Sequence, residues 1–388
     1  MKQTQNEIRL DLAVFSPDAT NRALELLFKA RYNGDGNGDE WTGDELPFIK
    51  RVVSAFLKRG KERLKAFKED LLGRMTQEVT RTFPNIERPV IKNKDNWTEK
   101  EMDNVEFYLE SLANRDWDFE DHALSIDLAW QRALKPDDVA EEAVWLATKS
   151  TLLGKVAANW QQEEPPTEKQ QQRLADELPG KPEEVRAWYP LPRNESRALD
   201  FAAHHAAENI TNLSDKARKQ MREIIFRHLQ KRQNGDFTGQ SLKSELFDTF
   251  GELNRDWTRI AVTEAGECFL QGMIMGMTPG TQVKRVEHFD TACTFCRQID
   301  GVIATVVAAD APNKDPNTMI WPGKNNIGRS AAPRKRVGGA LVPRSPEEMW
   351  WLPAGLAHPH CRGNWVRVEK KEEPEDPEFT ALLAQYLS

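Results

Sequence analysis

The spacing of apolar residues changes at Pro279, and this change restricts the fold more than any other feature of the sequence. Before Pro279, long stretches repeat apolar residues every three or four positions, as amphipathic helices do. After it, the segments 281–290, 301–309 and 363–369 are short, rich in β-branched residues and typical of strands. The chain is therefore expected to be α+β and predominantly α, with a small β-sheet near its end.

The helical spacing and a change of composition suggest how the 388 residues are divided. Helices are predicted within 18–31, 46–83, 97–114, 136–160, 196–230 and 252–277. Between them, residues 161–196 are rich in Pro, Gln and Glu and predict a linker or extended arm. We therefore expect a helical N-terminal region over 1–160, a second domain over 197–370 and an acidic tail over 371–388.

Charge and hydropathy exclude several classes of protein. The net charge of −7 gives no overall attraction to nucleic acid, so such binding would need a local basic patch. The chain has no apolar run of about 18 residues, and its start lacks the apolar core of a signal peptide. No membrane association is expected. Four cysteines are too few for a disulfide framework and indicate folding in a reducing cytoplasm.

Two pairs of metal-binding residues lie far apart in the sequence. Cys293 and Cys296 form a C-x2-C pair, and His358 and Cys361 form an H-x2-C pair after sixty-one intervening residues. Tetrahedral zinc takes four nitrogen or sulfur ligands, commonly as two close pairs, so these residues predict a structural zinc site. Buried apolar thiols and redox chemistry are the alternatives. Cys268 lies in a helical stretch and is expected to be a packing residue.

A basic segment between the second and third predicted strands is the strongest positive patch in the linear sequence. Mobile basic segments bind phosphate backbones without reading base sequence, so we predict contact with DNA. The alternatives are an acidic protein surface or simple solvation. The predicted DNA-binding residues are Lys324, Arg329, Arg334, Lys335, Arg336 and Arg344.

Three further groups are weaker candidates. The Asn/Asp/Gly loop 33–44 fits part of the calcium-loop template, but it departs from the template at its first, eighth and twelfth places, and a flexible polar turn is the preferred interpretation. Arg255, Arg259 and Glu264 lie on one predicted helix and form either a binding cluster or an ion-paired helix face. The pair His204–His205 has no partner at matching spacing and is assigned no role. No set of nucleophile, base and oxyanion donor can be identified, so the protein is not expected to be an enzyme.

Three motifs, in this order, resemble the phage Mu F-like minor head protein family. They are "RDWTRIAVTEAGECFLQG", "FDTACTFCRQIDG" and "HPHCRGNW", and the resemblance covers about residues 195–370. The matching positions are Arg255, Arg259, Ala261, Thr263, Glu264, Asp290, Cys293, Cys296, Asp300, Gly301, His358, Pro359, Cys361 and Arg362. One position departs from the pattern, because the last cysteine of the family falls on Gly363. If that cysteine were the fourth ligand, either His360 would have to replace it or the site would be lost.

The resemblance implies a structural role inside a phage head. Proteins of this family are present in few copies, associate with the portal and affect head assembly or DNA delivery. The implied partners are therefore the portal protein, the major capsid or scaffolding protein and packaged DNA. The implied locations are the capsid interior in the virion and the host cytoplasm during assembly. Two alternatives remain, namely a metal-dependent nuclease, for which Asp300 is the nearby carboxylate, and a toxin or effector that carries a Mu F-like domain.

Overall fold

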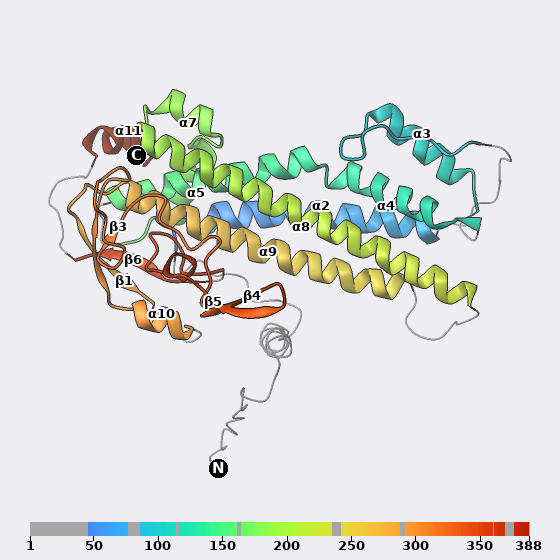
Figure 1. Cartoon of the computed structure of the whole chain (residues 1–388). Coiled ribbons are helices and arrows are strands. Elements are labelled where there is room, and N and C mark those ends of the chain that lie inside the picture. The colour runs from blue at the N-terminus through green and yellow to red at the C-terminus, as the bar shows by residue number, and fades with distance from the viewer. Residues whose placement is uncertain are drawn as a thin grey trace, which may run out of the picture. The chain divides into compact units, whose positions relative to one another are not determined.

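In the computed structural model, long helices pack along one another and a small sheet lies at one end of them (Figure 1). The described residues are 46–76, 86–113, 116–160, 164–234, 242–287, 292–359, 361–368 and 376–387. The predicted helix at 18–31 and the loop 33–44 lie outside these ranges. The helices are α2 (Lys50–Thr76), α3 (Glu99–Glu110), α4 (Phe119–Ala133), α5 (Pro136–Asn159), α6 (Glu168–Glu177), α7 (Pro182–Trp188), α8 (Arg193–Gln233), α9 (Leu242–Met275), α10 (Thr294–Ile299) and α11 (Pro377–Leu387). The predominance of helix confirms the expected α+β class.

Local sequence explains where several helices begin. Thr98 starts α3 with a capping box, in which its side chain accepts a hydrogen bond from the Glu101 backbone N–H and the Glu101 carboxylate accepts one from the Thr98 backbone N–H. Asp118 and Asp121 form the same reciprocal arrangement at the start of α4. Pro136 begins α5, where its missing N–H would have no partner in any case.

Helices α5 and α9 approach each other closely because glycines lie at their contact. A Cβ added to Gly154 would lie 1.9 Å from the carbonyl oxygen of Phe269. A Cβ added to Gly272 would lie 1.9 Å from the carbonyl oxygen of Thr151. The two backbones are therefore in direct contact, which holds α9 in place at the end that leads into the sheet.

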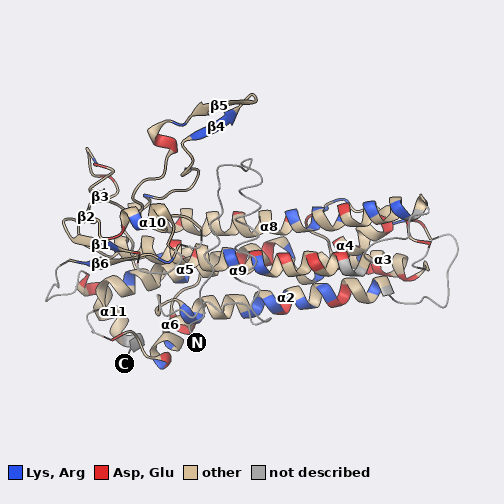
Figure 2. Cartoon of the chain, turned by 90° about the horizontal axis from the view of Figure 1, so that it is seen from below, with Lys and Arg blue, Asp and Glu red and all other residues tan. Residues whose placement is uncertain are grey.

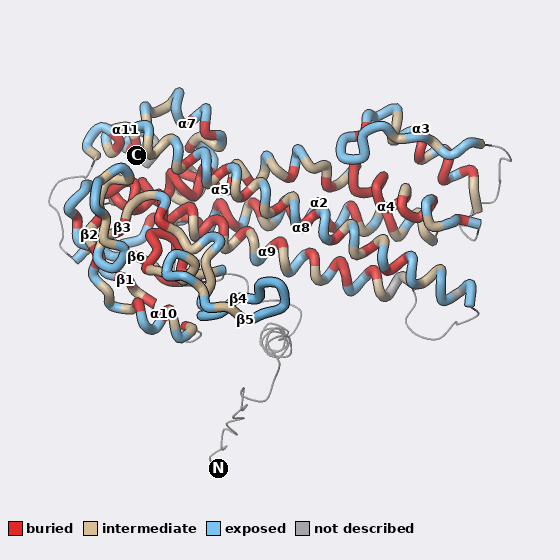
Figure 3. The backbone as a smooth tube through the Cα atoms, in the orientation of Figure 1, coloured by how far each residue is buried: buried red, intermediate tan, exposed pale blue. Residues whose placement is uncertain are grey.

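Aromatic side chains fill the space between α2 and its neighbours. Phe67 is fully buried and packs edge-on against Trp130 of α4 at 5.0 Å and against Phe250 of α9 at 5.3 Å between ring centroids. Nearer the start of α2, Phe56 stacks on Trp257 with ring centroids 5.8 Å apart. Burial of such rings supplies much of the hydrophobic stabilisation of a helical core. Figure 3 shows the buried positions along the facing sides of these helices.

The sheet has the strand order β3-β2-β1-β6 and is mixed. Its strands are β1 (Gln282–Val286), β2 (Ile303–Val306), β3 (Met319–Ile320) and β6 (Asn364–Arg367). Strand β1 pairs antiparallel with both β2 and β6, and β2 pairs parallel with β3. The three strands predicted after Pro279 are thus confirmed as β1, β2 and β6. Because β6 pairs with β1, the chain just before β6 lies beside the chain just after β1.

A separate hairpin extends from the segment that was expected to be a loop. Strands β4 (Arg334–Val337) and β5 (Ala340–Pro343) form a two-stranded ribbon, followed by the short helix η3 (Pro346–Glu348). The turn between the strands is made by Gly338 and Gly339, whose φ angles are 55° and 87°. Only glycine adopts such angles readily at both positions, which explains the tight two-residue turn.

The segment 161–196 differs from the predicted linker. Its described part contains α6 and α7, and Leu174, Leu178 and Val185 are buried. The Lys149 ammonium of α5 donates a hydrogen bond to the Ala175 carbonyl, which holds α6 against α5. Gln and Glu are good helix formers, so a few well-placed apolar residues are enough to fold this segment. The hydrophobic core of the N-terminal helices therefore includes residues of this segment, and the segment does not separate two cores.

The described part of the C-terminal segment is also packed on the helices rather than extended. Phe379 and Leu383 of α11 are buried. Asp376, just before α11, forms an ion pair with the buried Lys155 at 3.2 Å and accepts a hydrogen bond from the Tyr189 hydroxyl at 2.9 Å. The predicted acidic tail is therefore attached to α5 and α7 at its last residues.

Candidate metal centre

The first cysteine pair is placed by a short helix. Cys293 is the residue before α10, and its Sγ accepts a hydrogen bond from the Cys296 backbone N–H at 3.5 Å. Sulfur here takes the part that a Ser or Asp oxygen usually takes at the start of a helix. The turn places the two thiols on the same side of α10.

The second pair lies in the turn before β6. The Cys361 backbone N–H donates to the His358 carbonyl at 3.0 Å, which closes a tight turn around Pro359. The pairing of β6 with β1 then brings this turn to α10, since Asn364 lies opposite Val286 in the register. Residues separated by sixty-one positions in the sequence thus meet in space because of a sheet pairing.

Three of the predicted ligands, Cys293, Cys296 and His358, have ligand atoms within 4.8 Å of one another, and Cys361 meets this group at Cys296. The Nε2 atom of His358 is 3.1 Å from the Cys296 Sγ and 3.3 Å from the Cys293 Sγ. The Cys296 and Cys361 sulfurs are 3.9 Å apart. For tetrahedral zinc, standard bond lengths place two sulfurs about 3.8 Å apart and a sulfur and a nitrogen about 3.5 Å apart. The three distances differ little from these values.

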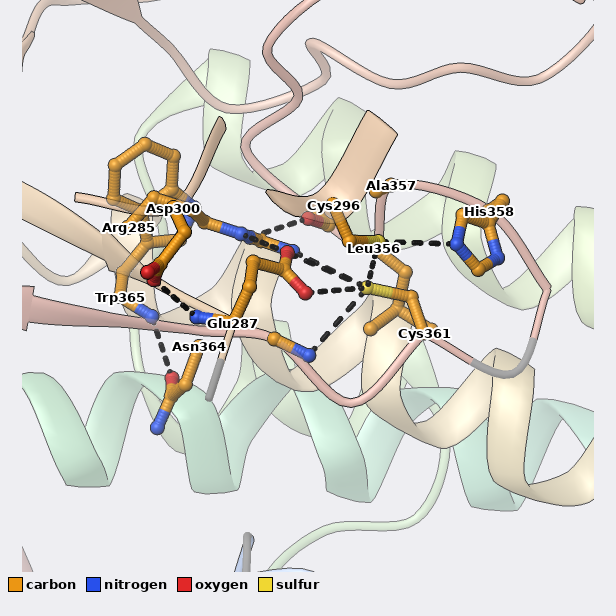
Figure 4. A network of polar contacts seen from close by, with 12 residues as sticks. Arg285, Glu287, Cys296, Asp300, Leu356, Ala357, His358, Cys361, Asn364 and Trp365 are labelled. Atoms are coloured by element: carbon orange, nitrogen blue, oxygen red, sulfur yellow. Dashed lines mark hydrogen bonds and ion pairs between the residues drawn. The ribbon is translucent and has the colours of Figure 1, made fainter. Parts of the chain in front are cut away.

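The fold adds Glu287 and Arg285 to this cluster, and neither was predicted from the sequence. Both carboxylate oxygens of Glu287 are 3.5 Å from the Cys361 Sγ. The Arg285 guanidinium bonds to Glu287 at 2.7 Å and lies 3.6 Å from the same sulfur, and both charged side chains are fully buried (Figure 4). The signal in the sequence was the alternation of strand β1, in which residues 283, 285 and 287 share one face. Because Val283 is buried on that face, two charged residues there indicate an internal ion pair.

The electrostatics favour a thiolate at Cys361. A hydrogen bond with Cys296 and the nearby Arg285 guanidinium lower the pKa of Cys361 to about 4. The same hydrogen bond, together with burial, raises the pKa of Cys296, so the proton of this pair resides there. Burial raises the pKa of the Glu287 carboxyl to about 7, against the opposing effect of Arg285. A thiolate is the form of cysteine that binds metal.

Two overlapping groups of potential ligands result. Cys293, Cys296 and His358 form one group, and Glu287, Cys296 and Cys361 form the other, each with its ligand atoms within 4.8 Å of one another. In the second group, Arg285 already contacts both Glu287 and Cys361 and neutralises part of their charge. The five residues therefore form a cluster that could hold a metal ion. His360 lies outside the described residues.

Asp300 and Gly301 form hydrogen bonds with the backbone of Glu287 and Arg285. Asp300 accepts a hydrogen bond from the Glu287 backbone N–H at 2.8 Å through its carboxylate. Gly301 has a φ of 78° and donates its N–H to the Arg285 carbonyl at 2.8 Å. These contacts fix the end of β1, so Asp300 acts on the backbone that carries Glu287. Asp290 lies outside the described residues.

The predicted DNA-binding residues do not form one patch. Lys324 is buried, and its Nζ donates to the carbonyls of Pro316 at 2.6 Å and Met319 at 2.7 Å. Arg329 stacks 3.6 Å from the centroid of the Trp351 ring. Burial of the Lys324 ammonium contradicts its predicted contact with DNA. Its carbonyl partners instead give it a structural role, which the spacing of charges alone could not reveal.

The remaining cations of this segment belong to the hairpin. Lys335 pairs with Glu348, whereas Arg334 and Arg336 are exposed on β4. Arg344 is half-buried at the base of β5. Figure 2 shows that the hairpin extends away from the helices with basic residues on β4. Of the six predicted residues, Arg334 and Arg336 are thus the two that are exposed.

The α9 residues that the sequence singled out, Arg255, Arg259 and Glu264, lie in different environments. Arg255 and Arg259 are partly exposed beside Asp256, at 3.9 Å and 3.8 Å. Glu264 is buried instead, and it accepts hydrogen bonds from Asn209 at 2.8 Å and from His205 at 3.1 Å. The bond to Glu264 raises the pKa of His205. The pair His204–His205, which received no role from the sequence, thus contributes one residue to the α8–α9 interface.

Comparison with protein-family models, with curated proteins and with solved structures found no match. Among the helices that the structure describes, each is too short or too polar to cross a membrane.

Proposed function

We propose that Cys293, Cys296, His358 and Cys361 hold one structural zinc ion. The observation that carries this proposal is the position of the His358 Nε2, within 3.3 Å of two cysteine sulfurs from a different segment. A set of three thiols and one imidazole is soft, and zinc is the common ion that such a set selects in a structural site.

Burial favours a structural site over a catalytic one. A catalytic zinc keeps one position open for water or substrate. Here the nearest additional carboxylate, Glu287, is fully buried and already bonded to Arg285. Asp300 is engaged with the Glu287 backbone. This arrangement gives no support to the nuclease alternative, and we propose that the protein is not an enzyme.

A metal at this position would connect two distant parts of the chain. It would join α10 to the turn before β6 and so close the loop that contains β2, β3 and the hairpin. Closing a long loop restricts the unfolded chain, and metal-binding energy then contributes to folding. The small sheet would gain most of this stabilisation, because its strands are short.

We further propose that the chain is a minor head protein of a phage, of the Mu F-like kind. The support is the order of three motifs, of which the second and third meet at the cysteine–histidine cluster and the first contacts the chain beside it. In that region Glu267 of α9 accepts a hydrogen bond from the Leu356 backbone at 2.6 Å, just before His358. The proposed partners are the portal protein, the major capsid or scaffolding protein and packaged DNA, inside the capsid after assembly in the host cytoplasm.

For DNA, we propose non-specific contact through Arg334 and Arg336. Both are exposed on a ribbon that extends from the body of the protein, and they share one face because strand residues alternate. Two phosphate contacts would give weak binding that falls with salt.

Elemental analysis tests the metal site. Protein purified without added metal should contain one zinc per chain, and substitution with Co²⁺ should give the absorption of a tetrahedral thiolate complex. Cys293→Ser and His358→Ala should each lower the zinc content, whereas Cys268→Ser, a buried cysteine on α9, should leave it unchanged. Zinc far below one equivalent, with all four thiols freely titratable, would exclude the site.

The assembly role has a separate test. Mass spectrometry of purified virions should detect the chain in a small number of copies, and crosslinking should join it to the portal protein. If the chain is missing from virions, the head-protein proposal fails while the metal site stands. Cleavage of plasmid DNA by the zinc-loaded protein would instead favour the nuclease.

A further inference from the structure

A shallow concavity is lined by residues from the second half of α8. Figure 1 shows that this half of the helix leads away from the sheet. The concavity has a volume of about 970 Å³, and it lies between the first residue of α4, Phe119, and the second half of α8. Four cations line it, namely Lys216, Lys219, Arg222 and Arg227. Figure 2 shows basic residues on this part of α8. The site is separate from both the metal centre and the hairpin.

The charges of this surface are only partly neutralised. Lys216 and Lys219 are exposed, and neither forms an ion pair with any residue in the described ranges. Arg227 is 63% exposed and lies 3.8 Å from Glu245. Arg222 is held by Asp127 of α4, which orients it at the edge of the concavity. Among the described residues that line the concavity, Glu223 is the one acid.

An exposed aromatic ring lies among these cations. Phe226 is 55% exposed, although a phenylalanine of a helical bundle is normally buried. It is held edge-on against Phe119, with ring centroids 5.7 Å apart and planes at 87°. The contact fixes the orientation of the ring while much of it stays accessible to a ligand.

We propose that this surface binds a single strand of nucleic acid. The helix rises about 1.5 Å per residue, so the cations from Lys216 to Arg227 extend over about 16 Å and can follow several phosphates. Phe226 offers a face on which a base can stack, which is the usual combination in single-strand binding. An acidic protein surface would satisfy the cations but would leave the exposed ring without a planar partner. Nucleic acid is therefore the favoured ligand.

Fluorescence anisotropy with a labelled oligo-dT probe tests this proposal on the full chain. The triple variant Lys216→Ala, Lys219→Ala and Arg227→Ala should weaken binding about tenfold or more at low salt. It should also reduce the slope of log K against log salt by about 2, since each lost contact to a single strand contributes about 0.7. Phe226→Ala should weaken binding about tenfold with an unchanged salt slope, because stacking is not electrostatic.

Two matched controls separate this surface from general electrostatics and from the hairpin. The variant Lys58→Ala, Lys61→Ala and Lys65→Ala removes three exposed lysines of α2 and should have little effect. Arg334→Ala with Arg336→Ala tests the hairpin. Thermal unfolding of each variant should match that of the parent chain, so that a loss of affinity reflects the surface.

Three outcomes would overturn the inference. The first is equal loss of affinity in the α2 and α8 variants, which would indicate attraction by total charge alone. The second is an unchanged α8 variant beside a hairpin variant that no longer binds, in which case the proposed DNA contact stands and this one fails. The third is tighter binding of poly-glutamate than of oligo-dT, which would assign the surface to an acidic protein.

Discussion

The carboxylate of Glu287 occupies the space that a side chain at position 363 would need. A Cβ added to Gly363 would lie 2.0 Å from the Glu287 Oε1, and the Gly363 N–H donates to the Cys361 Sγ at 3.4 Å. Gly363 is the position where the resemblance to Mu F-like proteins places a cysteine. In this chain the buried carboxylate of Glu287, the residue after β1, fills that place, so a side chain at position 363 would have to displace it.

Gly363→Ala should therefore destabilise the protein by about 1–3 kcal/mol, because the added methyl group displaces a buried, ion-paired carboxylate. Urea unfolding measures the cost. The same substitution should cost less in a Glu287→Ala background, where the overlap is relieved. Equal costs in both backgrounds would show that Glu287 is not the residue that excludes a side chain.

The contact between α5 and α9 gives a second prediction. Gly272→Ala should lower the free energy of unfolding by about 3 kcal/mol or more, since the Cβ meets the Thr151 backbone and the helices must separate. Gly251→Ala on the same helix is the control, because a Cβ there meets no atom within 4 Å. It should stabilise the protein by about 0.5–1 kcal/mol through helix propensity. Similar effects of the two substitutions would contradict the close approach.

Lys324 predicts a dependence of stability on pH. Burial lowers the pKa of its amine from 10.5 to about 7, so between these values the unfolded chain carries a proton that the folded chain lacks. Stability therefore rises as the pH increases through this window, and below pH 7 the folded protein bears the cost of burying a charge. In Lys324→Met this contribution should be missing. The check is the difference between the two proteins in unfolding free energy at about pH 7 and about pH 10. A constant difference would mean that Lys324 is charged throughout.

The packed segment after α5 can be tested through Leu174. Leu174→Ala should cost about 2–5 kcal/mol, because its side chain is fully buried on α6. Gln172→Ala on the same helix should have little effect, since that side chain is only partly buried. Limited proteolysis should leave α6 and α7 intact. If cleavage occurs early within 168–188 and Leu174→Ala leaves the free energy of unfolding unchanged, the segment is instead the linker that its composition predicted.

Local patterns predicted much of the secondary structure. The stretches 136–160 and 252–277 were expected to be helical and are found in α5 and α9, because helix periodicity depends on neighbours three and four residues apart. Helices α6 and α7 were missed since a high content of Pro, Gln and Glu obscured a few buried apolar residues. The two-residue glycine turn of the hairpin was present in the sequence but was assigned to a loop.

The sequence by itself determined which residue types could bind a metal, and it placed them in two pairs of appropriate spacing. Only the tertiary structure decided that His358 reaches Cys293 and Cys296, because the pairing of β1 with β6 sets that distance. Only it could reveal Glu287 and Arg285 inside the cluster, the burial of Lys324 and the exposed Phe226 beside Phe119. The physical reason is that ligand geometry, burial and the neutralisation of charge depend on residues distant in the chain. Periodicity and spacing, in contrast, reflect only the relations between residues that are close together in the sequence.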